Sequence, residues 1–490
     1  MTVANIMKHP FRKSGANAAR SLILAGAALS GLGLANTGFA AAPAPDAAVG
    51  RTDRHDWIAA GTNTDHTPRM IPEQPEAVGG RIVVLRGGLV FDTQSLRVAP
   101  GSVVIQGRRV RAVLSPDSTA WPADAEVIDV TGKFVMPGLI DMHVHLTYPD
   151  NDTPSDVQAE DADGVLRGER NLRWFIEAGF TSVRDLNGVG DAPYRLADWA
   201  AQDAIPAPRV FTAGHIITGT GGHATERPVR PSHGPDYAWE RNGADAWRAA
   251  VRETFKKGAS VIKVASHFAP DEIQAAVDEA HRLGLKVTCD CETIYTQMAV
   301  EAGIDMIEHP LPRTDKTIAE MAQHHTASVP TLQVYQNVLD RAGGFWDSTS
   351  RRFTMTSDAN FALFEKMKKA GIVMGVGTDT IGDANKMIPN IYLAELKWFV
   401  KGGYSIPQAL QAATLTNARL LAMDDLIGSI QPGKLADVIV VDGRPDLDID
   451  ALRKVAMVFK DGRMMVRDGG VVIPPHVPVP LPRPSPAEKP

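Results

Sequence analysis

The chain of 490 residues has only two cysteines, Cys289 and Cys291, and this pair cannot form a disulfide framework. It has no basic tract. Its 51 Lys and Arg stand against 57 Asp and Glu, a net charge of −6, so it offers no electrostatic footprint for nucleic acid. Beyond residue 40, no segment approaches the run of about 20 apolar residues that a membrane span needs. What is present is 44% hydrophobic residues, enough for a sizeable core, which excludes a wholly disordered, collagen-like or coiled-coil chain.

The N-terminal residues 1–40 have the pattern of a secretory signal peptide. Residues 1–20 contain four Lys or Arg and no acidic residue. The segment 21–37 consists largely of small and apolar residues, and Gly38 and Ala40 form a small-x-Ala cleavage site. The alternative is a membrane anchor, but the apolar run is short and broken by glycines. We therefore expect an exported, periplasmic protein, with no membrane association once the signal is cleaved.

The two ends of the mature chain lack a regular period. Residues 41–80 are expected to form an N-terminal arm or loop. Residues 471–490 hold eight prolines, which predicts a Pro-rich tail of the polyproline type.

Between these ends one phrase recurs, in which a helix ends in a small residue and glycine and a short apolar strand follows, as at Ala178-Gly179 and Ala370-Gly371. Glycine supplies the left-handed cap of a helix, and a short apolar run is typical of a buried parallel strand. The alternation over residues 137–424 predicts an α/β fold, best a (β/α)8 barrel of the TIM type. In such barrels the functional side chains lie at the carboxyl ends of the strands. At these ends the chain has Asp185, Lys263, Asp290, His309 and Asp379.

The flanks of this segment differ from it. Residues 81–136 and 425–470 alternate with period two around glycine turns, which predicts short β-strands. Because one flank precedes the barrel and the other follows it, we expect the two to pair in one small composite β-sandwich.

The residue types at the strand ends predict a metal-binding site. His143 and His145 are two residues apart at the end of an apolar strand, so both imidazoles face the same side and can bind one ion. His309 and Asp379 end later strands, and imidazole with carboxylate suits zinc or a similar divalent ion. Lys263 lies inside an apolar strand and must lose its charge or find a partner. The alternative for Lys263 is a salt bridge to a neighbouring strand-end acid.

Several blocks of the sequence resemble the amidohydrolase superfamily of metal-dependent hydrolases. The resemblance spans roughly residues 80–470 and is closest to the branch with imidazolonepropionase-like and Xaa-Pro or Xaa-Arg dipeptidase-like enzymes. The blocks that carry it are VMPGLIDMHVH (135–145), DMIEH (305–309), GTD (377–379), AATLTNARLL (412–421) and IGSIQPGKLAD (427–437).

This resemblance implies a (β/α)8 barrel with a β-sandwich and a centre of one or two zinc ions or another divalent ion. It implies that His143 and His145 hold the more buried metal and that a carboxylated Lys263 bridges two metals. It implies that His309 holds the second metal. Asp379 would bind metal and act as general acid and base.

One family position departs from the pattern, because no histidine ends the strand before His309. The strand reads VTCDCET (287–293), and the best alignment puts Asp290 in the ligand position and Glu292 at a second histidine position. Counting back from His309 would choose Cys289 instead. Aspartate is a reasonable zinc ligand but favours a harder metal. Cys289 and Cys291 share the other face of the strand and are expected to pack against helices.

Four further residues are candidates for contact with a small-molecule substrate. His223 closes a glycine-rich turn, His267 follows the Lys263 strand, and Tyr335 is expected to end the strand before Asp379. Glu292 is the fourth. A plain loop histidine is the alternative for His223, and a core tyrosine is the alternative for Tyr335.

The predicted reaction is hydrolysis of an amide-type C–N bond in an N-acyl amino acid, dipeptide or amide-bearing small molecule, with a metal-activated hydroxide. Two alternatives stay open: a catalytically altered or inactive binding protein, and a cyclic-amide hydrolase or deaminase. By analogy with the family we also allow for a homo-oligomer.

Overall fold

A computed structural model describes residues 80–150, 161–223, 225, 238–343 and 353–473. All of these fall in one compact unit, which spans Asp46–Pro490. The predicted signal peptide, nearly all of the arm and most of the Pro-rich tail lie outside the described residues. Among the described helices, none has both the length and the apolar composition that crossing a membrane requires.

One antiparallel and parallel sheet of nine strands unites the two flanks of the sequence. Val83, Leu85, Val103, Val438 and Phe459 contribute to its apolar core, and its central strands β5 and β15 are buried along their whole length. The N-terminal flank gives β1 (Ile82–Asp92), β2 (Arg97–Gln106), β3 (Arg109–Leu114), β4 (Glu126–Asp129) and β5 (Phe134–Pro137). The C-terminal flank gives β15 (Val438–Val441), β16 (Val455–Lys460), β17 (Arg463–Arg467) and β18 (Gly470–Val471). Antiparallel pairing of β5 with β15 joins the flanks.

Parallel strands make up the middle of the chain. The first sheet contains β6 (Leu139–Val144), β7 (Phe180–Asp185) and β8 (Arg209–Thr212). The second sheet has the order β10-β9-β11-β12-β13-β14. Its strands are β9 (Ile216–Thr218), β10 (Ala238–Glu240), β11 (Val261–Ala265), β12 (Lys286–Asp290), β13 (Met306–Glu308) and β14 (Ala327–Val329).

The segment that leads to Asp379 is extended but is not a named strand. It bridges β14 through Ser328 and Met374 and bridges β6 through Val144 and Thr380, both in parallel. It therefore lies between the last strand of one sheet and the first strand of the other.

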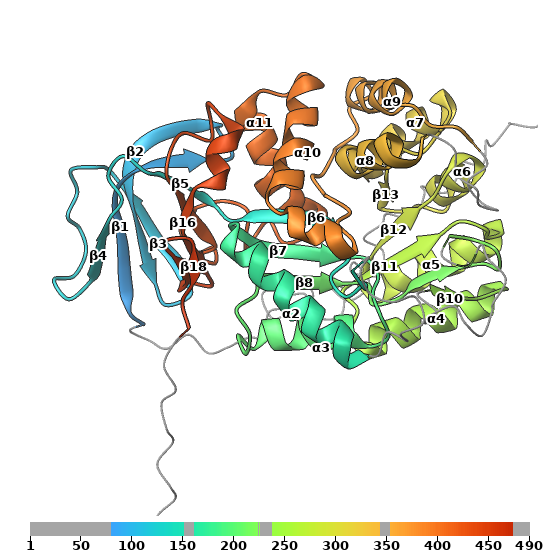
Figure 1. Cartoon of the computed structure of the whole chain (residues 1–490), viewed down its shortest axis with the longest axis horizontal. Coiled ribbons are helices and arrows are strands. Elements are labelled where there is room, and N and C mark those ends of the chain that lie inside the picture. The colour runs from blue at the N-terminus through green and yellow to red at the C-terminus, as the bar shows by residue number, and fades with distance from the viewer. Residues whose placement is uncertain (1–79, 151–160, 224, 226–237, 344–352, 474–490) are drawn as a thin grey trace, which may run out of the picture. The chain divides into compact units, whose positions relative to one another are not determined.

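Helices surround the parallel strands (Figure 1). Glycine in the left-handed conformation ends α4 at Gly258 (φ 114°), three residues before β11 begins, as the repeated phrase predicts. The helices before the Asp379 segment are α2 (Asp161–Glu177), α3 (Ala192–Ala201), α4 (Ala244–Lys257), α5 (Pro270–Arg282), α6 (Thr293–Glu301), α7 (Asp315–Gln323), α8 (Leu332–Ala342) and α9 (Ser357–Lys369). Those after it are η1 (Gly382–Met387), α10 (Asn390–Lys401), α11 (Ile406–Gln411), the π-helical η2 (Ala412–Thr416), α12 (Asn417–Leu420) and η3 (Ile449–Arg453).

A buried arginine ties the parallel strands to the nine-stranded sheet. Arg209 of β8 donates to Asp437 at 2.8 Å and to Asp461 at 2.9 Å, and its side chain is 3% exposed. Asp437 precedes β15 and Asp461 follows β16. Burial lowers the pKa of Arg209, but the two carboxylates outweigh it and raise the pKa overall.

Replacing Arg209 by alanine should destabilise the protein by about 3–5 kcal/mol, because the buried Asp437 loses its cation and Asp461 keeps the more distant Arg108, at 3.3 Å. The measurement is the urea midpoint of unfolding, followed by circular dichroism. Arg444→Ala is the matched control, since Arg444 pairs with Asp446 but its side chain is 44% exposed. Equal midpoints for the two variants would contradict the proposed role of this ion pair.

Candidate metal centre and active site

Two histidines face each other at the end of β6. The Nε2 atoms of His143 and His145 are 3.3 Å apart. Behind them, His143 Nδ1 lies 2.8 Å from Glu308 Oε2, and His145 Nδ1 lies 2.9 Å from the carbonyl oxygen of Asn187. A carboxylate or carbonyl oxygen only accepts, so each Nδ1 carries the proton and donates it.

This arrangement leaves lone pairs on the two facing nitrogens. Burial lowers the pKa of His143 well below its usual value, and Lys263 lowers it further, so the His143 ring is neutral. Two lone pairs at 3.3 Å repel each other unless a cation lies between them. Metal-ligating histidines usually donate their second N–H to a carboxylate or a backbone carbonyl, as both do here.

The carboxylate of Asp379 completes the first group. Its Oδ1 lies 3.4 Å from His143 Nε2 and 3.2 Å from His145 Nε2. Burial raises the pKa of Asp379, but His309, His145 and Lys263 outweigh it, so the pKa lies below its usual value and the group is ionised. Ligands of a tetrahedral zinc ion stand about 3.3 Å from one another. The three side chains therefore fit a divalent cation, and His143, His309 and Asp379 also have ligand atoms within 4.8 Å of one another.

A second group surrounds Asp290, which ends β12. Its Oδ2 lies 3.2 Å from His309 Nε2 and 3.6 Å from Lys263 Nζ. Lys263 Nζ is also 3.4 Å from His143 Nε2, so this side chain lies between the two groups. The contact with Asp290 also agrees with the alternative that Lys263 forms a salt bridge to a strand-end acid.

The strand register places Asp290, and not Cys289, toward Lys263 and His309. Cys289 and Cys291 are fully buried on the other face, among the apolar residues of the core. Their sulfur atoms lie next to each other there. Both cysteines are thus packed in the interior, away from the candidate metal ligands.

A buried ion pair lies behind His143. Arg184 of β7 donates to Glu308 Oε1 at 2.6 Å, and both side chains are fully buried. Thr288 also donates its hydroxyl proton to Glu308. Arg184 therefore binds a carboxylate of the protein itself and lies beneath the site.

Left-handed backbone turns bring neighbouring side chains to the site. Glu308 ends β13, and strand alternation would point His309 to the opposite face. His309 instead adopts φ 64°, and Asp379 adopts φ 52°, both uncommon for residues other than glycine. Thr331, with φ 44°, holds His309 through a contact of 2.9 Å between Oγ1 and Nδ1. Such backbone strain gathers at functional sites.

The remaining candidates lie around these groups. His223 Nε2 is 3.4 Å from Asp290 Oδ2. His267 Nδ1 is 3.2 Å from the carbonyl oxygen of Thr220. Glu292 is buried and accepts the Ser266 hydroxyl proton at 3.0 Å.

The prediction for Tyr335 was wrong in its local structure. The strand β14 ends at Val329, and the left-handed turn at Thr331 starts the helix α8, in which Tyr335 lies. The ring of Tyr335 nevertheless lies 5.0 Å from that of His309 between centroids, and the side chain is 3% exposed.

Sequence reasoning missed the residues that orient the histidines, namely Glu308, Asn187 and Thr331. It also missed Asp141, which accepts from the backbone N–H groups of His143 and Thr378 at 3.0 Å each. Burial raises the pKa of Asp141 to about 7 although Thr378 lowers it. A signal existed for Glu308, because an acid in an apolar strand needs a partner as Lys263 does.

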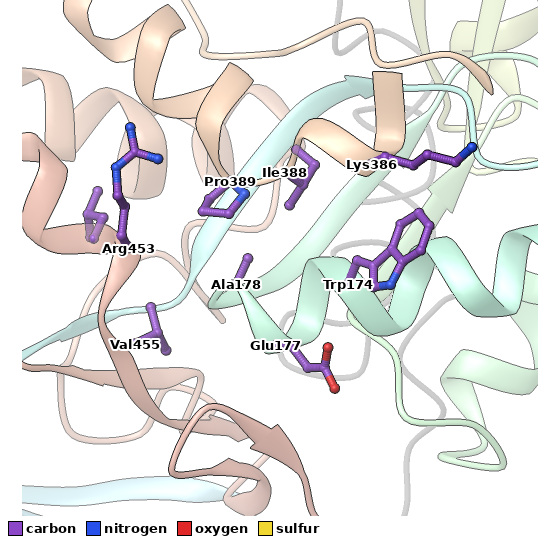
Figure 2. Close-up of a pocket in the computed structure, with 9 residues that line it drawn as sticks. Trp174, Glu177, Ala178, Lys386, Ile388, Pro389, Arg453 and Val455 are labelled. Atoms are coloured by element: carbon purple, nitrogen blue, oxygen red, sulfur yellow. The ribbon is translucent and has the colours of Figure 1, made fainter. Parts of the chain in front are cut away.

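A separate cavity of about 280 Å³ lies where η1, η3 and the end of α2 meet. Figure 2 shows Ile388 and Pro389 above Ala178, with Trp174 and Lys386 at one end and Arg453 at the other. None of its lining residues belongs to the candidate site.

Comparison with known proteins gives the family. The amidohydrolase family pattern matches residues 134–465. An imidazolonepropionase of Geobacillus kaustophilus is 24% identical over 76% of this chain and 92% of its own length. The solved structure of an amidohydrolase is 30% identical, with a TM-score of 0.70 over 79% of this chain and 99% of that chain. A Xaa-Pro dipeptidase with methionine bound in its active site is 26% identical, with a TM-score of 0.70 over 78% and 99%.

These likenesses imply a TIM-type barrel with an additional domain, in agreement with the mixed α/β structure. Members of the family usually depend on metal, and a His/His/Asp group capable of holding one is present here. The resemblance inferred from the sequence blocks is confirmed: the chain belongs to the amidohydrolase family and is a hydrolase that acts on C–N bonds.

Proposed function

We propose that this protein is a metal-dependent hydrolase that cleaves an amide-type C–N bond in a small molecule. The observation that carries the proposal is the pair of facing Nε2 atoms of His143 and His145, with Asp379 Oδ1 at 3.2 Å and 3.4 Å. Three ligand atoms at these separations match the spacing of ligands around one tetrahedral cation.

The candidate ligands can be assigned to one or two zinc ions, or to another divalent ion. His143, His145 and Asp379 would hold the first. Lys263, if carboxylated, would be shared with a second held by His309 and Asp290. A bound cation would acidify the attacking water and polarise the substrate carbonyl.

Asp379 is the proposed general base and acid. Its ionised carboxylate accepts a proton from water as the water oxygen bonds to the carbonyl carbon. Asp379 then delivers that proton to the nitrogen as the C–N bond breaks, so the products are a carboxylic acid and an amine. The lowered pKa of Asp379 keeps the carboxylate ionised, as the first step requires, and makes its protonated form a stronger acid for the second step.

The substrate class proposed is an N-acyl amino acid, a dipeptide or an amide-bearing small molecule. The likeness to a Xaa-Pro dipeptidase supports it. Tyr148, whose ring centroid is 5.4 Å from that of His145, offers apolar surface next to the cation pocket. Tyr335, beside His309, is buried and packs behind that ring. A cyclic amide is the second candidate, supported by the imidazolonepropionase relative.

The surrounding architecture is part of this proposal. We propose that the two parallel sheets and the Asp379 segment close into one (β/α)8 barrel over residues 137–424, with the joined flanks as a β-sandwich. The bridges of that segment to β14 and to β6 support closure. Export to the periplasm, guided by residues 1–40, is proposed from the sequence pattern alone.

Asp379→Asn should lower kcat at least about 100-fold, because the amide cannot take the proton. The metal content should stay close to that of the parent protein. The assay is hydrolysis of a panel of N-acyl amino acids and dipeptides, with metal measured by plasma mass spectrometry. Asp358→Asn, at an exposed position in α9, is the control. Full activity of Asp379→Asn would contradict the assigned role.

Purified protein should contain about one to two equivalents of zinc or manganese, and chelation should abolish hydrolysis reversibly. His143→Ala should remove at least one equivalent. His324→Ala, which changes an exposed histidine after α7, should remove none. A metal-free protein with full activity would refute metal dependence.

Glu308→Gln should weaken metal binding by about 10–100-fold, because the His143 ring loses the carboxylate that fixes its tautomer. Competition with a chromophoric chelator measures the affinity. Glu301→Gln, at an exposed position in α6, is the control, and near-ultraviolet circular dichroism checks that the variant is folded. An unchanged affinity would show that Glu308 serves only to neutralise Arg184.

A further inference from the structure

A single oxygen atom gathers three nitrogens from three segments of the chain. Asp290 Oδ2 lies 3.2 Å from His309 Nε2, 3.4 Å from His223 Nε2 and 3.6 Å from Lys263 Nζ. Of these side chains, His223 alone comes from a turn outside the named strands and their ends. Its position next to Asp290 therefore needs an explanation.

The turn that carries His223 is built to a fixed position. A Cβ atom at Gly219 would lie 1.7 Å from the carbonyl oxygen of His267, and one at Gly222 would lie 2.2 Å from that of Ser266. Thr218 also donates its hydroxyl proton to the Ser266 carbonyl at 2.9 Å. Only glycine permits this close packing against the segment that follows Lys263, so the turn holds His223 beside the strand ends.

The separation of 3.4 Å distinguishes two roles for His223. An N–H···O hydrogen bond has its usual length at about 2.9 Å and rarely exceeds about 3.2 Å. Two ligands of one tetrahedral cation stand about 3.3 Å apart. The 3.4 Å from Asp290 Oδ2 to His223 Nε2 matches the second value, and the 3.2 Å to His309 Nε2 is compatible with both.

The residue at the end of β12 explains why a further metal ligand such as His223 would be needed. The resemblance described in the sequence analysis implies a histidine at the position of Asp290, where this chain contributes a carboxylate oxygen. His223 brings an imidazole to the same place from the neighbouring turn. Asp290 and His223 together would restore the nitrogen ligand and add one negative charge.

We propose that His223 is a metal ligand and that, with Asp290, it replaces the missing strand-end histidine at a second divalent-cation site shared with His309 and Lys263. This inference rests on the proposed metal-dependent function. It assigns His223 to the cation, where the sequence had suggested contact with substrate. The added carboxylate should let the second site accept Mn²⁺ as well as Zn²⁺.

The test counts metal in four proteins loaded with Zn²⁺ or with Mn²⁺: the parent, His223→Ala, Asp290→His and the double variant. The parent should hold about two equivalents and His223→Ala about one. Asp290→His returns the histidine to the strand, so removing His223 in that background should leave about two. The His223 side chain is 31% exposed, so its loss should not prevent folding, which circular dichroism verifies.

His267→Ala is the matched control, because His267 contacts the same turn through Thr220 and should not change the count. Two equivalents in His223→Ala, or an equal loss on removing His223 in both backgrounds, would overturn the inference and leave the proposed function intact. One equivalent in the parent would also overturn it. A parent protein that binds no metal would overturn the proposed function itself.

Discussion

The site depends on two imidazole nitrogens that are held with their lone pairs toward each other. The acceptors behind His143 and His145 impose this orientation, and both acceptors are fixed by the protein interior. Glu308 in turn is held by Arg184, and the ion pair is buried completely. Such a pair is a weak source of stability, since burying two charges costs free energy that their attraction only partly offsets. Its position directly behind a metal-candidate ligand supplies a functional reason for retaining it.

The carboxyl ends of the parallel strands bring residues that are far apart in the sequence together in one site. β6 and its end deliver His143 and His145. β11, β12 and the end of β13 each deliver one candidate side chain, and the extended segment next to β6 delivers Asp379. Left-handed residues at several of these ends redirect a side chain that strand alternation would send into the helical layer. The strained backbone at His309 and Asp379 costs free energy, but it directs these two side chains into the candidate metal site.

The sequence was sufficient for features that depend on short spacing. The two-residue interval of His143 and His145 placed both rings on one face, and the recurring glycine before each strand located Asp290 and His309 at strand ends. Lys263 was expected at a strand end too, but it lies in the middle of β11. It was insufficient where contacts join distant segments, as for Arg184 and Glu308, which are 124 residues apart. Tyr335 was assigned to a strand because the turn at Thr331 rests on an uncommon backbone conformation that residue preferences do not reveal. The missing histidine was visible in the sequence, but the turn that brings His223 to Asp290 was not.

The most direct test of the account is a crystal structure of the zinc-replete protein with diffraction data collected on both sides of the zinc absorption edge. The account predicts an anomalous peak between the Nε2 atoms of His143 and His145 and in contact with Asp379. Absence of any peak there, with the two rings turned so that a nitrogen proton points at its neighbour, would contradict it.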